Sequence, residues 1–112
     1  MVIPVRHLSH VSIVVDSAAS LPSNMVQESG FHVVPMTLNF GEEVYADGCN
    51  LSPTEFYSML KKSQVLPTTS APSPARFMEA FRRAAQDTES VLCLTVGSHF
   101  SSSFDSAMVA AR

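Results

Sequence analysis

The sequence predicts an α/β fold with a mainly parallel sheet and flanking helices. Two short apolar runs, residues 11–15 and 90–96, are rich in β-branched side chains and have the unbroken hydrophobicity of strands buried on both faces. Segments with helical spacing lie between and after these runs, in the order β-α-β-α-α-β-α. Alternation of this kind is typical of a layered fold in which right-handed crossovers connect parallel strands.

The first predicted helix, residues 20–30, follows the strand at 11–15. Ser20 is placed to cap the N-terminus of this helix, Pro22 fits its first turn, and Gly30 stands where a C-terminal cap is expected. These signals predict a short helix that ends at the glycine.

Residues 31–40 predict the second strand. Pro35 interrupts it and removes one backbone donor from the hydrogen-bond ladder, so we expect an edge position or a bulge there. The segment FGEEVYADG that follows predicts a turn and an irregular return of the chain.

Two further helices have clear start signals. Ser52 and Glu55, in the segment SPTE, form a capping-box pattern, and the helix behind them runs to about Lys62. Ser73 caps the next helix, whose apolar residues recur at helical spacing as Phe77, Ala80, Phe81 and Ala84. Residues 90–96 then predict the last strand and 103–112 the last helix.

Composition and charge narrow the class of protein. With 46% hydrophobic and 15% charged residues, the 112-residue chain is expected to fold as one globular domain. A net charge of −3 and a pI near 5.7 give no basic surface for DNA or RNA, so nucleic acid is not an expected partner.

The cysteines and the N-terminus bear on the cellular compartment. Cys49 lies in a polar loop and Cys93 in an apolar run, a pattern that favours free thiols in a reducing, cytoplasmic setting over a disulfide framework. Residues 1–10 read as a flexible segment ahead of the domain, since Arg6 and the histidines break their apolar character. We therefore expect neither a secretory signal nor a membrane span there.

Three loops rich in serine stand out as candidate binding segments: DSAAS after the first strand, PTTSAPS before the third helix, and GSHFSSS after the last strand. Ligands of parallel α/β sheets bind beyond the carboxyl ends of the strands. Hydroxyls and the free N–H groups of helix starts donate to anionic oxygens, so these loops suggest a carboxylate or phosphate ligand. The alternative is that the serines only cap helices and close turns.

Other kinds of site have less support. The histidines show no metal-binding spacing, and the sequence contains neither G-x-x-x-x-G-K nor G-x-G-x-x-G, so we expect no metal and no cofactor. A hydrolase triad of Ser98, His99 and Asp105 can be imagined, but GSHFS is not a G-x-S-x-G nucleophile elbow. A small serine-dependent hydrolase or phosphotransferase that uses Ser101 or His99 is the alternative function.

Five segments in order resemble the DegV family of bacterial proteins: VVDSAASLP, VVPMTLNFGEEVYADG, SPTEFYSML, PTTSAPSPARF and GSHFSSSFDSA. The resemblance covers the chain from Val11 onward. It implies a protein of two α/β domains that clasp one long-chain fatty acid. It also implies a lipid-binding role without catalysis, in which the protein presents the acyl carboxylate to a separate fatty acid kinase subunit.

The same resemblance assigns residues to the site. The family's T-S-Q-P-S and L-S-G-T motifs place the fatty acid head group against Thr69, Ser70 and Ser101. Further residues expected to line the site are Asp16, Ser17, Ser73, Ser98 and Ser102.

Several positions depart from the family motifs. Ala18, Ala71 and Ser103 replace a threonine, a glutamine and a threonine, and Ser102 replaces the glycine of L-S-G-T. If the backbone at that glycine required a positive φ, Ser102 would be strained.

The resemblance also implies that residues 11–112 are an N-terminal domain and that a C-terminal domain is absent from the chain. The missing domain would supply the opposite wall of the acyl tunnel. We therefore expect the 112-residue chain to self-associate through the uncovered face, or to bind fatty acids weakly.

Overall fold

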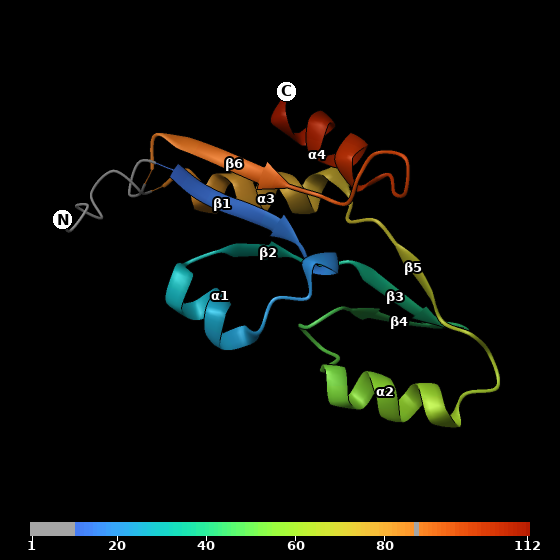
Figure 1. Cartoon of the computed structure of the whole chain (residues 1–112). Coiled ribbons are helices and arrows are strands. Elements are labelled where there is room, and N and C mark those ends of the chain that lie inside the picture. Colours follow the sequence, from blue (N-terminus) through green and yellow to red (C-terminus); the bar gives the residue numbers. More distant parts are fainter. Residues whose placement is uncertain (1–10, 87) are drawn as a thin grey trace.

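The computed structural model describes residues 11–86 and 88–112 (Figure 1). The predicted flexible segment, residues 1–10, lies outside the described residues. The described chain forms a parallel and an antiparallel sheet of three strands each. No helix in the described part of the chain is long and apolar enough to cross a lipid bilayer.

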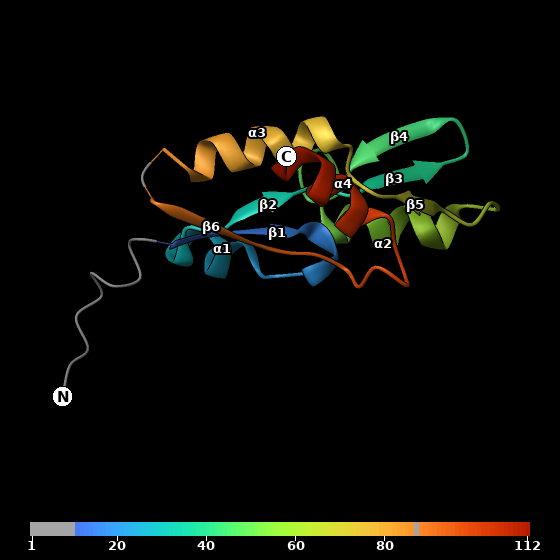
Figure 2. The ribbon, with the colours of Figure 1, turned by 90° about the horizontal axis from the view of Figure 1, so that it is seen from above.

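The parallel sheet has the strand order β2-β1-β6 and confirms the predicted fold class. Its strands are β1 (Val11–Asp16), β2 (His32–Val34) and β6 (Ser90–Leu94). Figures 1 and 2 show helix α3 (Pro74–Ala84) behind this sheet and α1 (Ser23–Ser29) in front of it, while α4 (Ser103–Ala111) packs against α3. The predicted helices therefore flank a parallel sheet.

The core of this region lies between the sheet and α3. Val14 and Phe77 are fully buried there, as the helical spacing of the apolar residues in α3 predicts. Val91 and Cys93 of β6 pack against the same cluster. Because side chains alternate along a strand, Leu92 and Leu94 face the opposite side of the sheet, where both remain about half exposed.

The second sheet is antiparallel and was not predicted. Its strand order is β4-β3-β5, formed by β3 (Thr37–Phe40), β4 (Glu43–Ala46) and β5 (Thr68–Ser70). Helix α2 (Pro53–Lys62) covers one of its faces through a core of Leu38, Phe40, Leu51, Phe56 and Met59.

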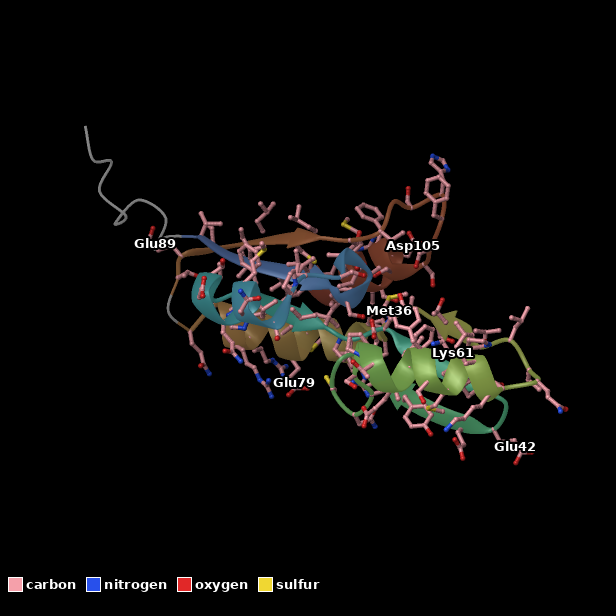
Figure 3. All side chains as sticks on the ribbon, turned by 60° about the horizontal axis from the view of Figure 1, so that its bottom comes forward. Met36, Glu42, Lys61, Glu79, Glu89 and Asp105 are labelled. Atoms are coloured by element: carbon pink, nitrogen blue, oxygen red, sulfur yellow. The ribbon has the colours of Figure 1, made fainter. Side chains whose placement is uncertain are left out.

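The segment predicted as one strand, residues 31–40, is divided between the two sheets. It leaves the parallel sheet after Val34 and enters the antiparallel sheet at Thr37. Pro35 has no N–H to give to a ladder, and the N–H of Met36 donates to the Ser17 Oγ at 2.8 Å instead. Figure 3 shows Met36 between the two sheets, whereas Glu42 and Lys61 lie toward the far end of the antiparallel sheet.

The start of the first helix was predicted wrongly. Helix α1 begins at Ser23 after Pro22, without a side-chain cap, and Ser20 instead ends a 3₁₀ turn, η2 (Ser17–Ala19), in the left-handed conformation at φ 51°. The 3₁₀ turn forms in place of the predicted helix start because the side chain of its first residue, Ser17, accepts a hydrogen bond from the Met36 N–H. The C-terminal cap at Gly30, with φ 69°, is confirmed.

The other cap signals give the helices that they predict. Ser52 and Glu55 form the complete capping box of α2, and the Ser73 Oγ accepts from the Arg76 N–H at the start of α3. The segment FGEEVYADG, predicted as a turn and an irregular return, contains strand β4 in its middle four residues. Gly41, at φ 60°, makes the turn between β3 and β4 in a conformation that favours glycine.

Candidate functional site

The candidate site lies where the two sheets meet. Figures 1 and 2 show the loop between β6 and α4 at the same end of the parallel sheet as the antiparallel sheet, and β5 is the strand nearest to this loop in both views. β5 is also an edge strand, so one side of its backbone is unpaired within the sheet. The carboxyl ends of β1 and β6 therefore open toward β5, as expected for a binding site in a parallel fold.

Ser101 is half-buried in the loop between β6 and α4. Its Oγ accepts a hydrogen bond from the Ser103 N–H at 3.1 Å. Since that N–H occupies a lone pair of the oxygen, the hydroxyl hydrogen of Ser101 is left to donate. The Ser101 hydroxyl can thus donate to an oxygen that carries negative charge.

Thr69 and Ser70 are exposed neighbours on β5. They pair with Leu38 and Thr37 of β3, and successive strand residues point to opposite faces of a sheet. One carboxylate at this edge can therefore meet one of the two hydroxyls together with the unpaired backbone of β5. The structure brings β5 and the Ser101 loop to the same end of the molecule but separates the Thr69 and Ser70 side chains.

Asn39 bonds to residues of the candidate site and was not named from the sequence. Its Nδ2 donates to the Ser70 Oγ at 3.2 Å and to the Thr68 carbonyl oxygen at 3.5 Å. The Ser70 hydroxyl hydrogen is consequently free to donate, like that of Ser101. The polar alternation of Thr37 and Asn39 with the buried Leu38 and Phe40 was a signal that could have revealed this open face.

Asp16 and Ser17 take internal partners at the end of β1. One carboxylate oxygen of Asp16 accepts from the Val96 N–H and from the Ser103 Oγ, each at 2.9 Å, and Ser17 is bound to Met36. Asp16 is 2% exposed and Ser103 is fully buried. These residues support the site from within.

The remaining predicted lining residues divide by role. The Ser73 side chain caps α3, and Ser98 is exposed in the loop after β6. Ser102 precedes α4 with φ −77° and forms no side-chain cap, so replacing the family's glycine causes no backbone strain here.

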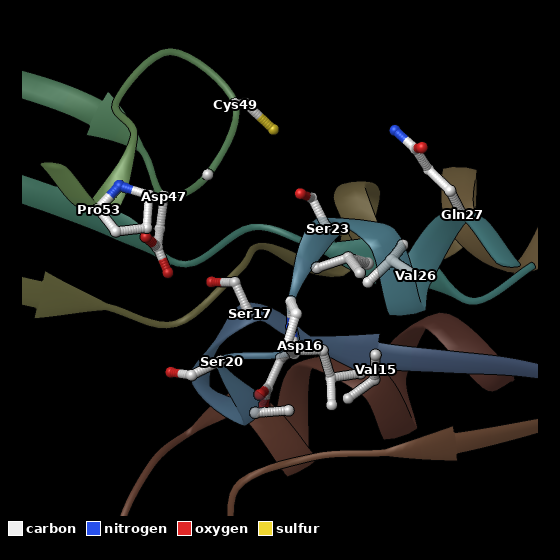
Figure 4. Close-up of a pocket in the computed structure, with 15 residues that line it drawn as sticks. Val15, Asp16, Ser17, Ser20, Ser23, Val26, Gln27, Asp47, Cys49 and Pro53 are labelled. Carbon is white, nitrogen blue, oxygen red and sulfur yellow. The ribbon is translucent and has the colours of Figure 1, made fainter. Parts of the chain in front are cut away.

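A cavity of about 490 Å³ lies beside the site, between α1 and the loop that carries Cys49 (Figure 4). Its apolar wall includes Val15, Val26 and Val33, and Asp47 brings a carboxylate to its polar wall. The Asp16 carboxylate is almost fully buried and bonds to Val96 and Ser103 instead. No lysine or arginine lines the cavity among the described residues. The negative charge of Asp47 makes it a poor place for a carboxylate head group, whereas its apolar wall suits hydrocarbon.

The negative charge of Asp16 also acts on Cys93. Partial burial, followed by the nearby Asp16 carboxylate, raises the pKa of the Cys93 thiol above its ordinary value. Cys93 and the exposed Cys49 are both free thiols. Cys93 is therefore a core side chain that resists ionisation.

Metal and triad chemistry find no support in the described residues. Within 11–86 and 88–112, no group of three His, Cys, Asp or Glu side chains is placed to hold a metal ion. In the same ranges, Ser98, His99 and Asp105 form no hydrogen bond with one another, and all three are exposed. His7 and His10 lie outside the described residues.

Comparison with protein families gives one family match, which covers residues 10–112. The matching family is DegV, described as uncharacterised protein, DegV family. A DegV domain-containing protein of Halalkalibacterium halodurans is 38% identical over 104 residues, which are 92% of this chain and 37% of that protein.

Solved structures with the same fold include fatty acid-binding proteins. A DegV family protein from Thermus thermophilus, described by its fatty acid binding, matches with a TM-score of 0.80 and 32% identity over 91% of this chain and 36% of that one. A stearic acid-binding protein from Eubacterium ventriosum matches with a TM-score of 0.83 and 31% identity over 90% and 35%. The chain thus spans little more than a third of the length of these relatives.

Proposed function

This chain belongs to the DegV family, and we propose that it forms the head-group part of a binding site for a long-chain fatty acid. The observation that carries the proposal is the Ser101 hydroxyl, whose oxygen is engaged by the Ser103 N–H and whose hydrogen is left to donate. The relatives from Thermus thermophilus and Eubacterium ventriosum, each described as binding a fatty acid, support the same ligand class.

The proposed head-group contacts come from both sheets. Ser101 donates from the β6–α4 loop, and Thr69 or Ser70 donates from the edge strand β5. The start of α4 lies beside Ser101, and its N-cap residue Ser102 makes no side-chain bond to the helix, so the helix dipole adds a favourable field for an anion. Hydrogen bonds to a charged group contribute roughly 1.5–3 kcal/mol each, so these groups govern the choice of a carboxylate.

The acyl tail supplies most of the proposed affinity. Each buried methylene contributes about 0.8 kcal/mol, so a long chain contributes on the order of 10 kcal/mol before the costs of binding. The apolar wall of the cavity, formed by residues such as Val26 and Val33, is the surface that this chain offers to the tail. The carboxylate of Asp47 in the same cavity favours a head group that stays outside it.

The proposed protein is a lipid carrier without catalysis of its own. By its family resemblance it would present the acyl carboxylate to a separate kinase subunit in the cytoplasm, where the free thiols of Cys49 and Cys93 are stable. The exposed Ser98, His99 and Asp105 offer no assembled nucleophile for the alternative hydrolase or phosphotransferase function.

Because the chain spans about 36% of the length of a solved relative, we propose that it forms only one wall of the fatty acid-binding site. Leu92 and Leu94 belong to the edge strand β6 and are 49% and 50% exposed, which favours pairing of this strand with a second copy. We expect light scattering to show concentration-dependent association, and Leu94→Lys to reduce it. A monomeric chain with the affinity of a full-length relative would contradict this proposal.

Native mass spectrometry tests the ligand class directly. Two proteins are purified from a bacterial host: this chain alone, and this chain joined to the remainder of a full-length relative. We expect a fatty acid to co-purify with the longer protein. Ligand-free protein that hydrolyses esters or transfers phosphate would instead favour the enzyme alternative. A titration with a C16 fatty acid then compares the two forms, and the shorter is expected to bind more weakly.

A further inference from the structure

We propose that Asp16 is a positioning residue for the Ser101 hydroxyl. It lies at the end of β1, far from Ser101 in the sequence, and its carboxylate holds both ends of the loop that carries Ser101. The ligand that this arrangement serves rests on the proposed function, but the arrangement itself is a property of the unliganded chain.

A single oxygen of Asp16 makes both connections. Its Oδ2 accepts from the N–H of Val96, just after β6, and from the Oγ of Ser103, the first residue of α4, at 2.9 Å each. Because Asp16 is 2% exposed and Ser103 fully buried, water does not replace these bonds when they break. The loop from Gly97 to Ser102 is thus closed at its base by one side chain.

Ser103 transmits this constraint to Ser101. Its hydroxyl donates to Asp16, while its backbone N–H donates to the Ser101 Oγ at 3.1 Å. Fixing the Ser103 side chain against Asp16 fixes the direction of the N–H on the same residue. That N–H in turn leaves the Ser101 hydroxyl hydrogen to point elsewhere, toward a ligand.

The charge of Asp16 supports a positioning role over simple packing. Within the described part of the chain, Asp16 has no salt bridge with a lysine or arginine, and its carboxylate accepts from the Val96 N–H and the Ser103 hydroxyl. An apolar residue would fill the same place at the core without the cost of burying a carboxylate. What the carboxylate adds is a strong acceptor for two donors at once.

The first part of the test needs no ligand. Amide hydrogen exchange, followed by NMR, is measured at positions 96 and 103 in the parent chain and in Asp16→Ala, Ser103→Ala and Asp16→Asn. We expect Asp16→Ala to speed amide exchange about tenfold or more at both positions, because the free energy lost with each hydrogen bond corresponds to about a tenfold change in the exchange rate. Ser103→Ala should do so at position 103 alone, and Asp16→Asn, which keeps an acceptor oxygen, should retain most of the protection.

Ser52→Ala is the matched control, because it removes a side-chain hydrogen bond at the start of α2, away from this loop. If Asp16→Ala is too unstable to study, Ser103→Ala and Asp16→Asn still decide the question. Exchange at position 103 in Ser103→Ala that equals exchange in Ser52→Ala would overturn the positioning role. Asp16→Asn could also lose protection at both positions, by as much as Ser103→Ala loses at position 103. That result would overturn the claim that an acceptor oxygen at position 16 holds the loop.

The second part measures selectivity for the head group. The affinity for a C16 fatty acid is compared with that for the C16 alcohol, which has the same tail but no carboxylate. Ser103→Ala and Ser101→Ala should each lower the acid-to-alcohol ratio by about tenfold, whereas Ser52→Ala should leave it unchanged. A parent chain that shows no preference for the acid refutes the proposed function, while the exchange data still decide the role of Asp16. A ratio lowered by Ser101→Ala but not by Ser103→Ala overturns the positioning role.

Discussion

The parallel region and the antiparallel region bury their cores to different extents. In the parallel region, formed by β1, β2, β6 and their helices, Val14 and Phe77 are completely buried between a sheet and α3. In the antiparallel region, β3 to β5 and α2, the core is thinner, and Phe40 keeps 8% of its surface exposed. The difference indicates that the parallel region supplies most of the stability, while the site draws residues from both.

The largest expected effect is the loss of the Phe77 side chain. Phe77→Ala should lower the free energy of unfolding by about 3–5 kcal/mol, because it removes a fully buried aromatic ring and leaves a cavity. Phe40→Ala, the matched change in the antiparallel region, should cost less. Urea denaturation of both variants measures the difference, and equal losses would break the comparison between the two regions.

The second prediction concerns ligand affinity. Ser101→Ala, in a full-length protein, should weaken fatty acid binding by roughly 1.5–3 kcal/mol without unfolding the chain, because it removes a donor to a charged group. Asn39→Ala should have a smaller effect, since it only frees the exposed Ser70 hydroxyl. Calorimetric titration provides the affinities, and Ser58→Ala, at an exposed serine of α2, serves as the control. Equal affinity of Ser101→Ala and the parent would refute the proposed head-group contact.

The third prediction concerns the cap of α2. Ser52→Ala should destabilise the antiparallel region by about 1 kcal/mol, since it removes the capping box. The backbone N–H of Ser52, followed by its hydroxyl, lowers the pKa of Glu55, so the stabilising contribution is present above the ordinary pKa of this carboxyl and is lost as the pH falls. Amide exchange of α2 at neutral and acidic pH tests both points. A variant indistinguishable from the parent at neutral pH would contradict them.

The smallest expected effect is at Cys93 in the parallel core. Since burial and the Asp16 charge raise its pKa, the folded chain holds the thiol proton more tightly than the unfolded chain. The stabilising contribution of the protonated Cys93 thiol is present below the ordinary thiol pKa. It is lost as the pH rises through the raised pKa of the folded chain. The parent should therefore lose more stability than Cys93→Ala between neutral and alkaline pH in urea denaturation. An identical pH dependence of both proteins would show that Cys93 does not contribute.

The parallel region was the more predictable from sequence. Its strands β1 and β6 appear in the sequence as apolar runs, although Leu92 and Leu94 of β6 are half exposed, and the cap signal of Ser73 marks the true start of α3. The short strands β4 and β5 give no such signal, because Glu43, Val44, Thr68 and Thr69 are exposed and their pairing with β3 is a long-range property.

The sequence suggested residues for the candidate site but not the hydrogen bonds between them. The serine-rich loops suggested an anion, and the resemblance singled out Ser101, but neither indicated the bonds of Asp16 to Val96 and Ser103. Asn39 was missed for the same reason, since its bond to Ser70 joins residues of different strands. The exact placement of Thr69 and Ser70 against Ser101 stays a prediction.

The pairing of Thr37 with Ser70 has a consequence for the architecture of the chain. These residues are the first of β3 and the last of β5, so the segment 37–70 leaves the parallel region and returns to nearly the same point. Topologically it is an insertion whose ends are already joined, and its removal would require only a short linker between Met36 and Ala71. The chain with the segment 37–70 and the chain without it therefore differ little in loop-closure entropy. The segment could therefore be exchanged for another without rebuilding the scaffold, and ligand preference could change by transplanting one continuous stretch of sequence.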